Sequence, residues 1–186
     1  MSPRTAADFY VSHSRDLSIM PKKKSPQKRL GTKEAAMVAT AVKALRNYEV
    51  FKIHKTKKET FFNHLVLVHL LHKKLPVKNK NIHCASFVGE TFRPECFVKG
   101  SSKYPLLAVE CKKLTDHSAK SRWKEGLSQC LLYSHEFKAV ILLLYDFTKS
   151  GAYYSALSSK KRLEYKFAQR LWKTQHIKII ALKPQA

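Results

Sequence analysis

Two glutamates and one lysine fall in a stretch of the chain that has the pattern of a β-hairpin. The apolar runs at 96–98 and 105–109 are joined by a loop that begins Gly-Ser-Ser-Lys-Tyr, which is typical of a hairpin turn. If Cys96 to Val98 pairs with Leu107 to Val109, Glu95 lies directly opposite Glu110. Like charges that face each other destabilise a strand pair, so a compensating cation is expected here.

Strand alternation adds Lys112 to this pair of glutamates. Side chains two residues apart share one face of a strand, so Glu110 and Lys112 are expected on one face and Val109 and Cys111 on the other. A divalent cation between the carboxylates would relieve their repulsion. Carboxylates, a metal that acidifies its water and a nearby ammonium are groups suited to phosphodiester hydrolysis. The alternative is a surface hairpin with scattered charges, because Glu-x-Lys triplets are common.

The charge of the whole chain indicates a polyanionic partner. Its 186 residues include 36 Lys and Arg against 13 Asp and Glu, a formal net charge of +23. Such an excess favours DNA, or RNA, as the partner. No long apolar segment or lipid-anchor motif is present, so a membrane is not expected as a partner. Four cysteines without a C-x-x-C pair and no secretory signal pattern predict an intracellular protein.

The length predicts one domain with a tail. Residues 1–31 are polar and basic without apolar periodicity, and are expected to be a disordered tail. The stretch that begins at Pro21 and ends at Arg29 (PKKKSPQKR) resembles a basic nuclear-import signal, which would make the protein nuclear; direct contact with phosphates is the alternative. Residues 32–186 are predicted to form a single domain.

Hydrophobic periodicity predicts an α/β domain with a central mixed β-sheet flanked by helices. Helices are expected at 32–47, 60–75, 122–137 and 157–173, and strands at 82–88, in both arms of the hairpin, at 139–147 and at 176–182. In the last helix, Leu163, Phe167 and Leu171 are expected to face inward. Asp146 ends a continuous apolar run, and a role in the following loop is expected for it.

The helix expected at 122–137 carries polar residues that can reach the hairpin. Gln129 and Tyr133 are one turn apart, so both can point in the same direction, and Glu125 shares their face. A second face, formed by Trp123, Leu127, Cys130 and Leu131, is expected to pack on the sheet.

The combination of Pro94-Glu95, Glu110-Cys111-Lys112 and Gln129-x-x-x-Tyr133 resembles the RecB-like branch of the PD-(D/E)XK nuclease superfamily, over residues 50–182 or so. The resemblance implies a restriction-endonuclease-like core and a deoxyribonuclease dependent on Mg²⁺ or Mn²⁺. It also implies Glu95 and Glu110 as metal ligands, Lys112 and Gln129 as catalytic residues, and Tyr133 in DNA binding. The family usually has Asp at the position of Glu95.

Further residues are assigned on the same basis. Many members have an accessory acid on the helix before the sheet, and Glu59 is the only acid available there; capping of the helix is its alternative role. His64 is the best-placed histidine for such a metal site, although a core or surface histidine is the commoner case. Phosphate contacts are expected from basic residues around the site: Lys57, Lys58, Lys113, Lys120, Arg122 and Lys124.

Two other functions are compatible with these features. One is a catalytically inactive nucleic-acid-binding module with a nuclease-like fold. The other is a basic RNA- or ribosome-associated protein without nuclease ancestry, for which Glu95, Glu110 and Lys112 would lie far apart. Endonuclease or exonuclease action, strand preference, and activity as a homodimer or as a subunit of a larger complex stay open.

Overall fold

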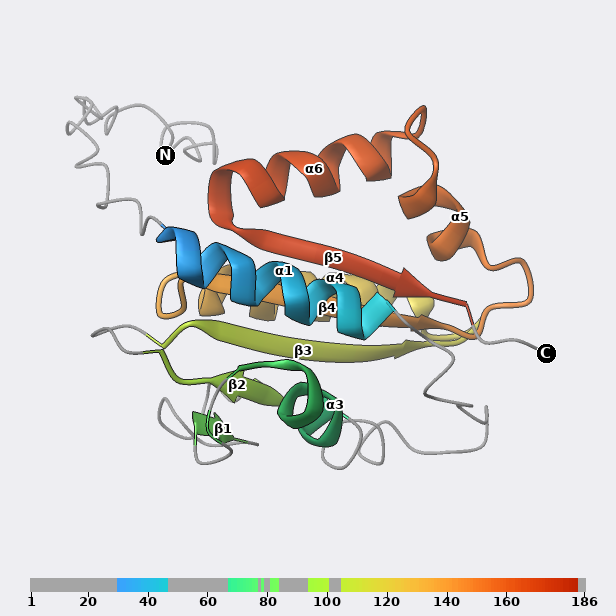
Figure 1. The fold of residues 1–186 in the computed structure, drawn as a ribbon. Coiled ribbons are helices and arrows are strands. Elements are labelled where there is room, and N and C mark those ends of the chain that lie inside the picture. Colours follow the sequence, from blue (N-terminus) through green and yellow to red (C-terminus); the bar gives the residue numbers. More distant parts are fainter. Residues whose placement is uncertain are drawn as a thin grey trace, which may run out of the picture.

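A five-stranded mixed β-sheet forms the centre of the chain in a computed structural model, which describes residues 30–46, 67–76, 78, 81–83, 94–100 and 105–183 (Figure 1). The strands lie side by side in chain order: β1 (Ile82–His83), β2 (Cys96–Val98), β3 (Leu107–Leu114), β4 (Ala139–Asp146) and β5 (Ile177–Leu182). β1, β2 and β3 are antiparallel, whereas β3, β4 and β5 run parallel. The predicted α/β fold with a central mixed sheet flanked by helices is therefore confirmed.

The β2–β3 hairpin has the register that the sequence predicted. Cys96 pairs with Val109, and Val98 pairs with Leu107. Continuing this register by one residue places Glu95, which directly precedes β2, opposite Glu110. The hairpin thus brings the two glutamates to the same end of the strand pair.

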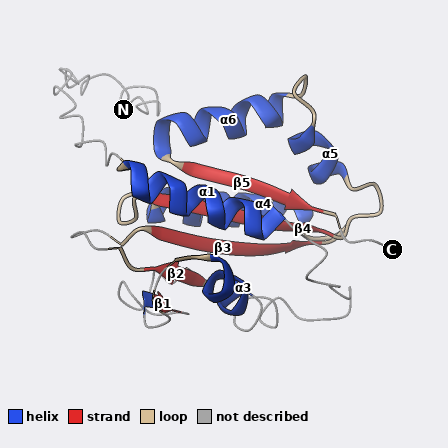
Figure 2. Ribbon diagram, viewed as in Figure 1, coloured by secondary structure: helices blue, strands red, loops and turns tan. Residues whose placement is uncertain are grey.

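Helices cover both faces of the sheet, as Figure 2 shows. On one face lie α1 (Thr32–Arg46) and α3 (Leu67–Lys74), and on the other lies α4 (Ala119–Tyr133). The short helix α5 (Ala152–Ser158) and α6 (Leu163–Gln175) follow β4 and lead back to β5. All eight residues of β4 are buried, as is usual for a parallel strand that is covered on both faces.

The two faces of β3 enter different hydrophobic clusters. Leu107, Val109 and Cys111 pack with residues of α1 and α3, while Ala108 and Leu114 pack with residues of α4. This alternation puts Glu110 and Lys112 on the α4 face, as predicted from the period of a strand.

The prediction of one basic helix at 157–173 is wrong in its start and in two of its three inward residues, whereas the inward position of Leu171 is confirmed. The segment forms two helices, and α6 begins only at Leu163. Leu163 is 78% exposed and Phe167 is 42% exposed, whereas Ala168 and Leu171 are buried. α6 packs through its C-terminal half onto β5 at the edge of the sheet, so the apolar residues of its first turns do not reach the core.

Several sequence predictions fall outside the described residues. These are most of the basic tail, the start of the helix expected at 60–75, the later part of the strand expected at 82–88, and the side chains of Glu59, His64, Lys57 and Lys58. Among the helices that the structure describes, none combines the length and the apolar character needed to span a membrane.

Asp146 organises the turn that follows β4. Its side chain is buried, and its Oδ1 accepts hydrogen bonds from Thr148 N (3.1 Å) and Thr148 Oγ1 (2.5 Å). Its Oδ2 accepts a hydrogen bond from Tyr154 N (2.9 Å) in the first turn of α5. The carboxylate therefore satisfies backbone donors at a helix start that would otherwise lack partners. These contacts agree with the loop role expected for Asp146.

Replacing Asp146 by Ala should destabilise the fold. The substitution leaves the buried N–H of Thr148 and the partly buried N–H of Tyr154 without their acceptor, so we expect the free energy of unfolding to fall by about 2–3 kcal/mol. Urea unfolding followed by circular dichroism measures the change. Asp116→Ala is the control, because Asp116 accepts one hydrogen bond, from Lys149 N, at an exposed site; its loss should stay below about 1 kcal/mol. Equal losses in the two variants would contradict the role of Asp146.

Candidate active site

A buried ion pair lies on the α4 face of β3. Lys112 Nζ is 2.8 Å from Glu110 Oε1, and the two side chains are 4% and 1% exposed. Removing two charges from water costs several kcal/mol per ion unless the pair has good geometry and further hydrogen bonds. The surroundings of this pair therefore have to supply additional partners.

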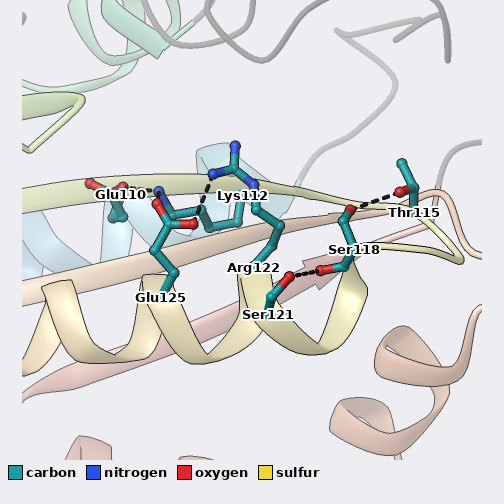
Figure 3. Close-up of polar contacts among 7 residues, drawn as sticks. All are labelled: Glu110, Lys112, Thr115, Ser118, Ser121, Arg122 and Glu125. Atoms are coloured by element: carbon teal, nitrogen blue, oxygen red, sulfur yellow. Dashed lines mark hydrogen bonds and ion pairs between the residues drawn. The ribbon is translucent and has the colours of Figure 1, made fainter.

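Helix α4 supplies the second partner of Lys112. Glu125 Oε1 accepts a hydrogen bond from Lys112 Nζ at 3.1 Å, and Glu125 Oε2 accepts one from Arg122 at 2.8 Å, as Figure 3 shows. The exposed fraction rises to 43% at Glu125 and 34% at Arg122. Alternating charges thus run from the buried Glu110 carboxylate, through Lys112 and Glu125, to the guanidinium at the surface.

Gly126 allows α4 to lie this close to β3. A Cβ atom added at this position would be 2.8 Å from Lys112 Cγ and 2.9 Å from Leu142 Cδ1, which is closer than carbon atoms approach each other without strain. The absent side chain leaves room for the stem of Lys112 beneath the helix. A glycine is therefore required for the position of Lys112.

The charges around Lys112 keep it protonated. Burial lowers the pKa of Lys112, but the charge of Glu110 and the hydrogen bonds to both carboxylates outweigh burial, and its pKa lies above the ordinary value. Burial likewise raises the pKa of Glu125, but the hydrogen bonds from Lys112 and Arg122 are stronger, and its pKa is lowered. At neutral pH, Lys112 is therefore a cation without a free lone pair, and the lowered pKa makes the Glu125 carboxylate a weak base, so neither is suited to act as a general base.

Tyr133 lies where the two glutamates of the hairpin meet. Its side chain is 3% exposed. Burial raises the pKa of the phenol well above its usual range, and the charge of Glu110, a hydrogen bond with Glu110 and the charge of Glu95 raise it further. Tyr133 therefore stays protonated and donates a hydrogen bond to the Glu110 carboxylate. The hairpin register places Glu95 opposite Glu110, and both carboxylates affect the pKa of Tyr133, so these three residues lie near one another.

Aromatic packing fixes the end of α4 that carries Tyr133. The Tyr133 and Phe137 rings are 6.3 Å apart, and the Phe137 and Phe97 rings are 6.0 Å apart, both edge to face. Phe97 belongs to β2, so these rings connect the helix end to the hairpin. The Tyr133 ring is therefore enclosed between the end of the helix and the hairpin.

Gln129 presents a polar atom that lacks a partner. Its Oε1 is buried and has no hydrogen-bond donor within the described part of the chain. A buried amide oxygen without a donor is destabilising by about 1–3 kcal/mol. Gln129 lies one turn from both Glu125 and Tyr133, so this acceptor is available for a ligand at the same site.

The structure separates the predicted site residues into two groups. Glu95, Glu110, Lys112 and Tyr133 come together between the hairpin and α4, and Gln129 lies one helical turn before Tyr133. In contrast, Lys113 lies on the other side of β3, where its Nζ is 5.2 Å from the centre of the Phe147 ring.

The basic residues of α4 differ in their surroundings. Lys120 and Lys124 are exposed, while Arg122 is bound to Glu125. Leu131, which was predicted to pack on the sheet, is 41% exposed, and that prediction was wrong. Gly126 occupies the sheet-facing position instead, because it permits the closest approach to β3.

The sequence did not identify Glu125 and Gly126 as residues of the site. Glu125 was placed on the face of Gln129 and Tyr133, but its bond to Lys112 was not predicted. Gly126 carries a signal that was available: an isolated glycine within a helical pattern often indicates a close approach to another element.

The donors at the site fit a hard divalent cation. Glu95 and Glu110 offer carboxylate oxygens and Gln129 offers an amide oxygen, and Mg²⁺ and Mn²⁺ prefer oxygen ligands. Within the described ranges, no group of three or more His, Cys, Asp or Glu residues is arranged to hold a metal. Glu59, the expected accessory ligand, lies outside these ranges. The candidate metal ligands are therefore two carboxylates and one amide.

Comparison with known proteins adds no relative to this description. No protein-family model matches the chain, and no curated protein matches it. A functional assignment therefore rests on the residues of this chain and their geometry.

Replacing Gly126 by Ala should destabilise the protein and displace Lys112. The added methyl group overlaps the Lys112 stem and Leu142, and overpacking of this kind costs about 1–3 kcal/mol. Urea unfolding measures the loss, and the NMR signal of the Lys112 ammonium reports the displacement. Ser128→Ala, on the exposed side of the same helix, is the control and should be neutral or slightly stabilising. A stability of Gly126→Ala equal to or above that of the wild type would contradict the close approach.

The contribution of Glu125 to stability should depend on pH. Its pKa is lowered in the folded chain, so its stabilisation is present above the unfolded-state pKa of roughly 4.3 and is lost as the pH falls through the folded-state pKa. We expect the difference in unfolding free energy between the wild type and Glu125→Gln to be constant near neutral pH and to vanish in acid. Because the Glu125 side chain is 43% exposed, the difference should stay below about 1 kcal/mol.

Urea unfolding between roughly pH 3 and 8 measures this difference, in a range where Lys112 stays charged. Glu136→Gln, at an exposed position in the turn after α4, is the matched control for the loss of one carboxylate and should give a smaller difference throughout. A Glu125→Gln difference that persists unchanged to the acid limit would show that the ion pair is not its source.

Proposed function

We propose that this chain is a metal-dependent nuclease that hydrolyses DNA phosphodiester bonds, and that it belongs to the RecB-like branch of the PD-(D/E)XK superfamily. One observation carries the proposal: a buried Glu110–Lys112 pair on β3 lies beneath α4 and beside Tyr133, with Glu95 in register across the hairpin. Buried charges are costly, and a folded protein retains such a group most readily at a functional site.

The side chains of the site support distinct roles. Lys112, held protonated by two carboxylates, would stabilise the negative charge that develops on the phosphate. Tyr133 orients the Glu110 carboxylate through its hydroxyl. Glu95, Glu110 and Gln129 would hold Mg²⁺ or Mn²⁺, which when bound polarises the phosphate and lowers the pKa of water.

The nucleic acid would approach along the first turns of α4. Lys120 and Lys124 are exposed there, and Arg122 ends the row of charges that leads from the site. Because the chain carries a net charge of +23, its affinity for nucleic acid should decrease steeply as the salt concentration increases. DNA is the proposed substrate, with RNA as an alternative polyanion. We also propose that the protein acts inside the cell. It would act in the nucleus if the stretch from Pro21 to Arg29 is an import signal.

A catalytically inactive nucleic-acid-binding module is the second candidate function. It is favoured by the way Glu110 is held: the ammonium of Lys112 lies 2.8 Å from its carboxylate, so the buried negative charge is neutralised without a metal. Glu95 also places its carboxylate one methylene farther from the backbone than the Asp usual in the superfamily, and Mg²⁺ demands strict geometry.

Cleavage of linear, circular and branched DNA in Mg²⁺ and in Mn²⁺ tests the leading proposal. The wild type should cut at least one of these substrates. Glu110→Ala and Lys112→Ala should each reduce the rate by about 100-fold or more, because each removes a group that acts on the developing charge. Glu136→Ala, at an exposed position of the same helix end, should cut at the wild-type rate.

The outcomes separate the two functions. Full activity in both the Glu110 and Lys112 variants would reject this site as the catalytic centre. Binding of DNA without cleavage, together with a calorimetric Mn²⁺ titration that does not change in Glu95→Ala and Glu110→Ala, would instead establish the inactive module.

A further inference from the structure

A groove lies on the other face of the sheet from the Glu110–Lys112 pair. It runs between α1 and the α6–β5 edge and has a volume of about 340 Å³. Its apolar wall consists of Ala35, Val38, Ala39 and Val42, which follow one another at helical spacing along α1, and of Trp172 from α6. Small-molecule sites have volumes of roughly 300–1,000 Å³ and mostly apolar walls, so this groove has the size of a small-ligand site.

Three cations line one end of the groove. Lys43 and Arg46 lie in the last turn of α1, and Lys178 projects from β5. Lys178 pairs in register with Ile141, which belongs to the cluster beneath α1, so both side chains lie on the α1 face. Lys178 Nζ is 5.7 Å from the centre of the Trp172 ring, close enough for a cation–π contact.

Within the described ranges, these cations lack a counter-charge: no acidic residue there lines the groove, and none of the three cations forms an ion pair. Burial lowers the pKa of Lys178, and the charge of Arg46 lowers it further. By contrast, Lys138, near the start of α1, is paired with Glu34 at 2.6 Å. Uncompensated positive charge beside a partly buried lysine favours an anion at this end.

We propose that the groove binds a small amphipathic organic anion, with an aromatic or aliphatic body and one carboxylate, sulfonate or phosphate group. The body lies against the α1 wall and Trp172, and the acidic group lies among Lys43, Arg46 and Lys178. A free small molecule fits better than a nucleic-acid backbone, because a backbone would leave the apolar wall uncovered. The site is separate from the proposed catalytic centre and does not depend on nuclease activity.

Calorimetric titration of the full chain with naphthalene-1-sulfonate tests the proposal. This probe combines an aromatic body with one fixed negative charge, and it should bind with a stoichiometry of about one per chain. Lys178→Met and Lys43→Met should each weaken binding by about tenfold or more, since each removes a charge-assisted contact. Lys33→Met removes an exposed charge from the first turn of α1, outside the groove, and should bind the probe like the wild type.

The body and the charge of the probe are tested separately. Sodium sulfate, which lacks the body, and 1-naphthalenemethanol, which lacks the charge, should each bind about tenfold more weakly or worse. The proposal is overturned if the sulfonate does not bind, if sulfate binds equally well, or if Lys33→Met weakens binding as much as Lys178→Met. Displacement of the probe by duplex DNA would assign the groove to a nucleic-acid surface and would also overturn the proposal. Lys43 is exposed, so its variant remains informative if Lys178→Met does not fold.

Discussion

The position of α4 against the sheet depends on the buried pair of Glu110 and Lys112. Two charges removed from water are destabilising unless other groups bind them, and here the helix provides those groups. Glu125 binds the ammonium, and Tyr133 donates a hydrogen bond to the glutamate. The helix can do so only because Gly126 leaves space for the lysine stem. The same helix therefore supplies hydrogen bonds to the buried pair and packs closely on the strand.

The two faces of the sheet carry different chemistry because a strand alternates its side chains. On the α4 face, β3 interrupts an apolar surface with charged side chains that are linked to solvent through Glu125 and Arg122. On the α1 face, the strands present an apolar surface, and the charges lie at the margin, around the groove lined by Trp172 and Lys178. The sheet thus separates the site formed by Glu110 and Lys112 on one face from the groove lined by cations on the other.

Much of the fold was predictable because it follows from local patterns. The register of the hairpin follows from two short apolar runs and one loop, and the shared face of Glu110 and Lys112 follows from the two-residue period of a strand. The buried strand β4 is a continuous apolar run that admits few other interpretations. The prediction for α6 was wrong, since Leu163 has the right spacing for a buried position but lies in a turn that does not reach the sheet.

By itself, the sequence determined the order of the elements, the facing glutamates, the lysine beside them and the large positive charge, because each depends on residues close together in the chain. Only the tertiary structure decided which residues that are far apart in the chain come into contact. It brought Glu125 to Lys112, sent Lys113 to Phe147 on the opposite face, enclosed Tyr133, and placed Lys178 beside Arg46. The physical reason is that a partner for a buried charge is selected by the packing of whole helices on the sheet, and no local period encodes that packing.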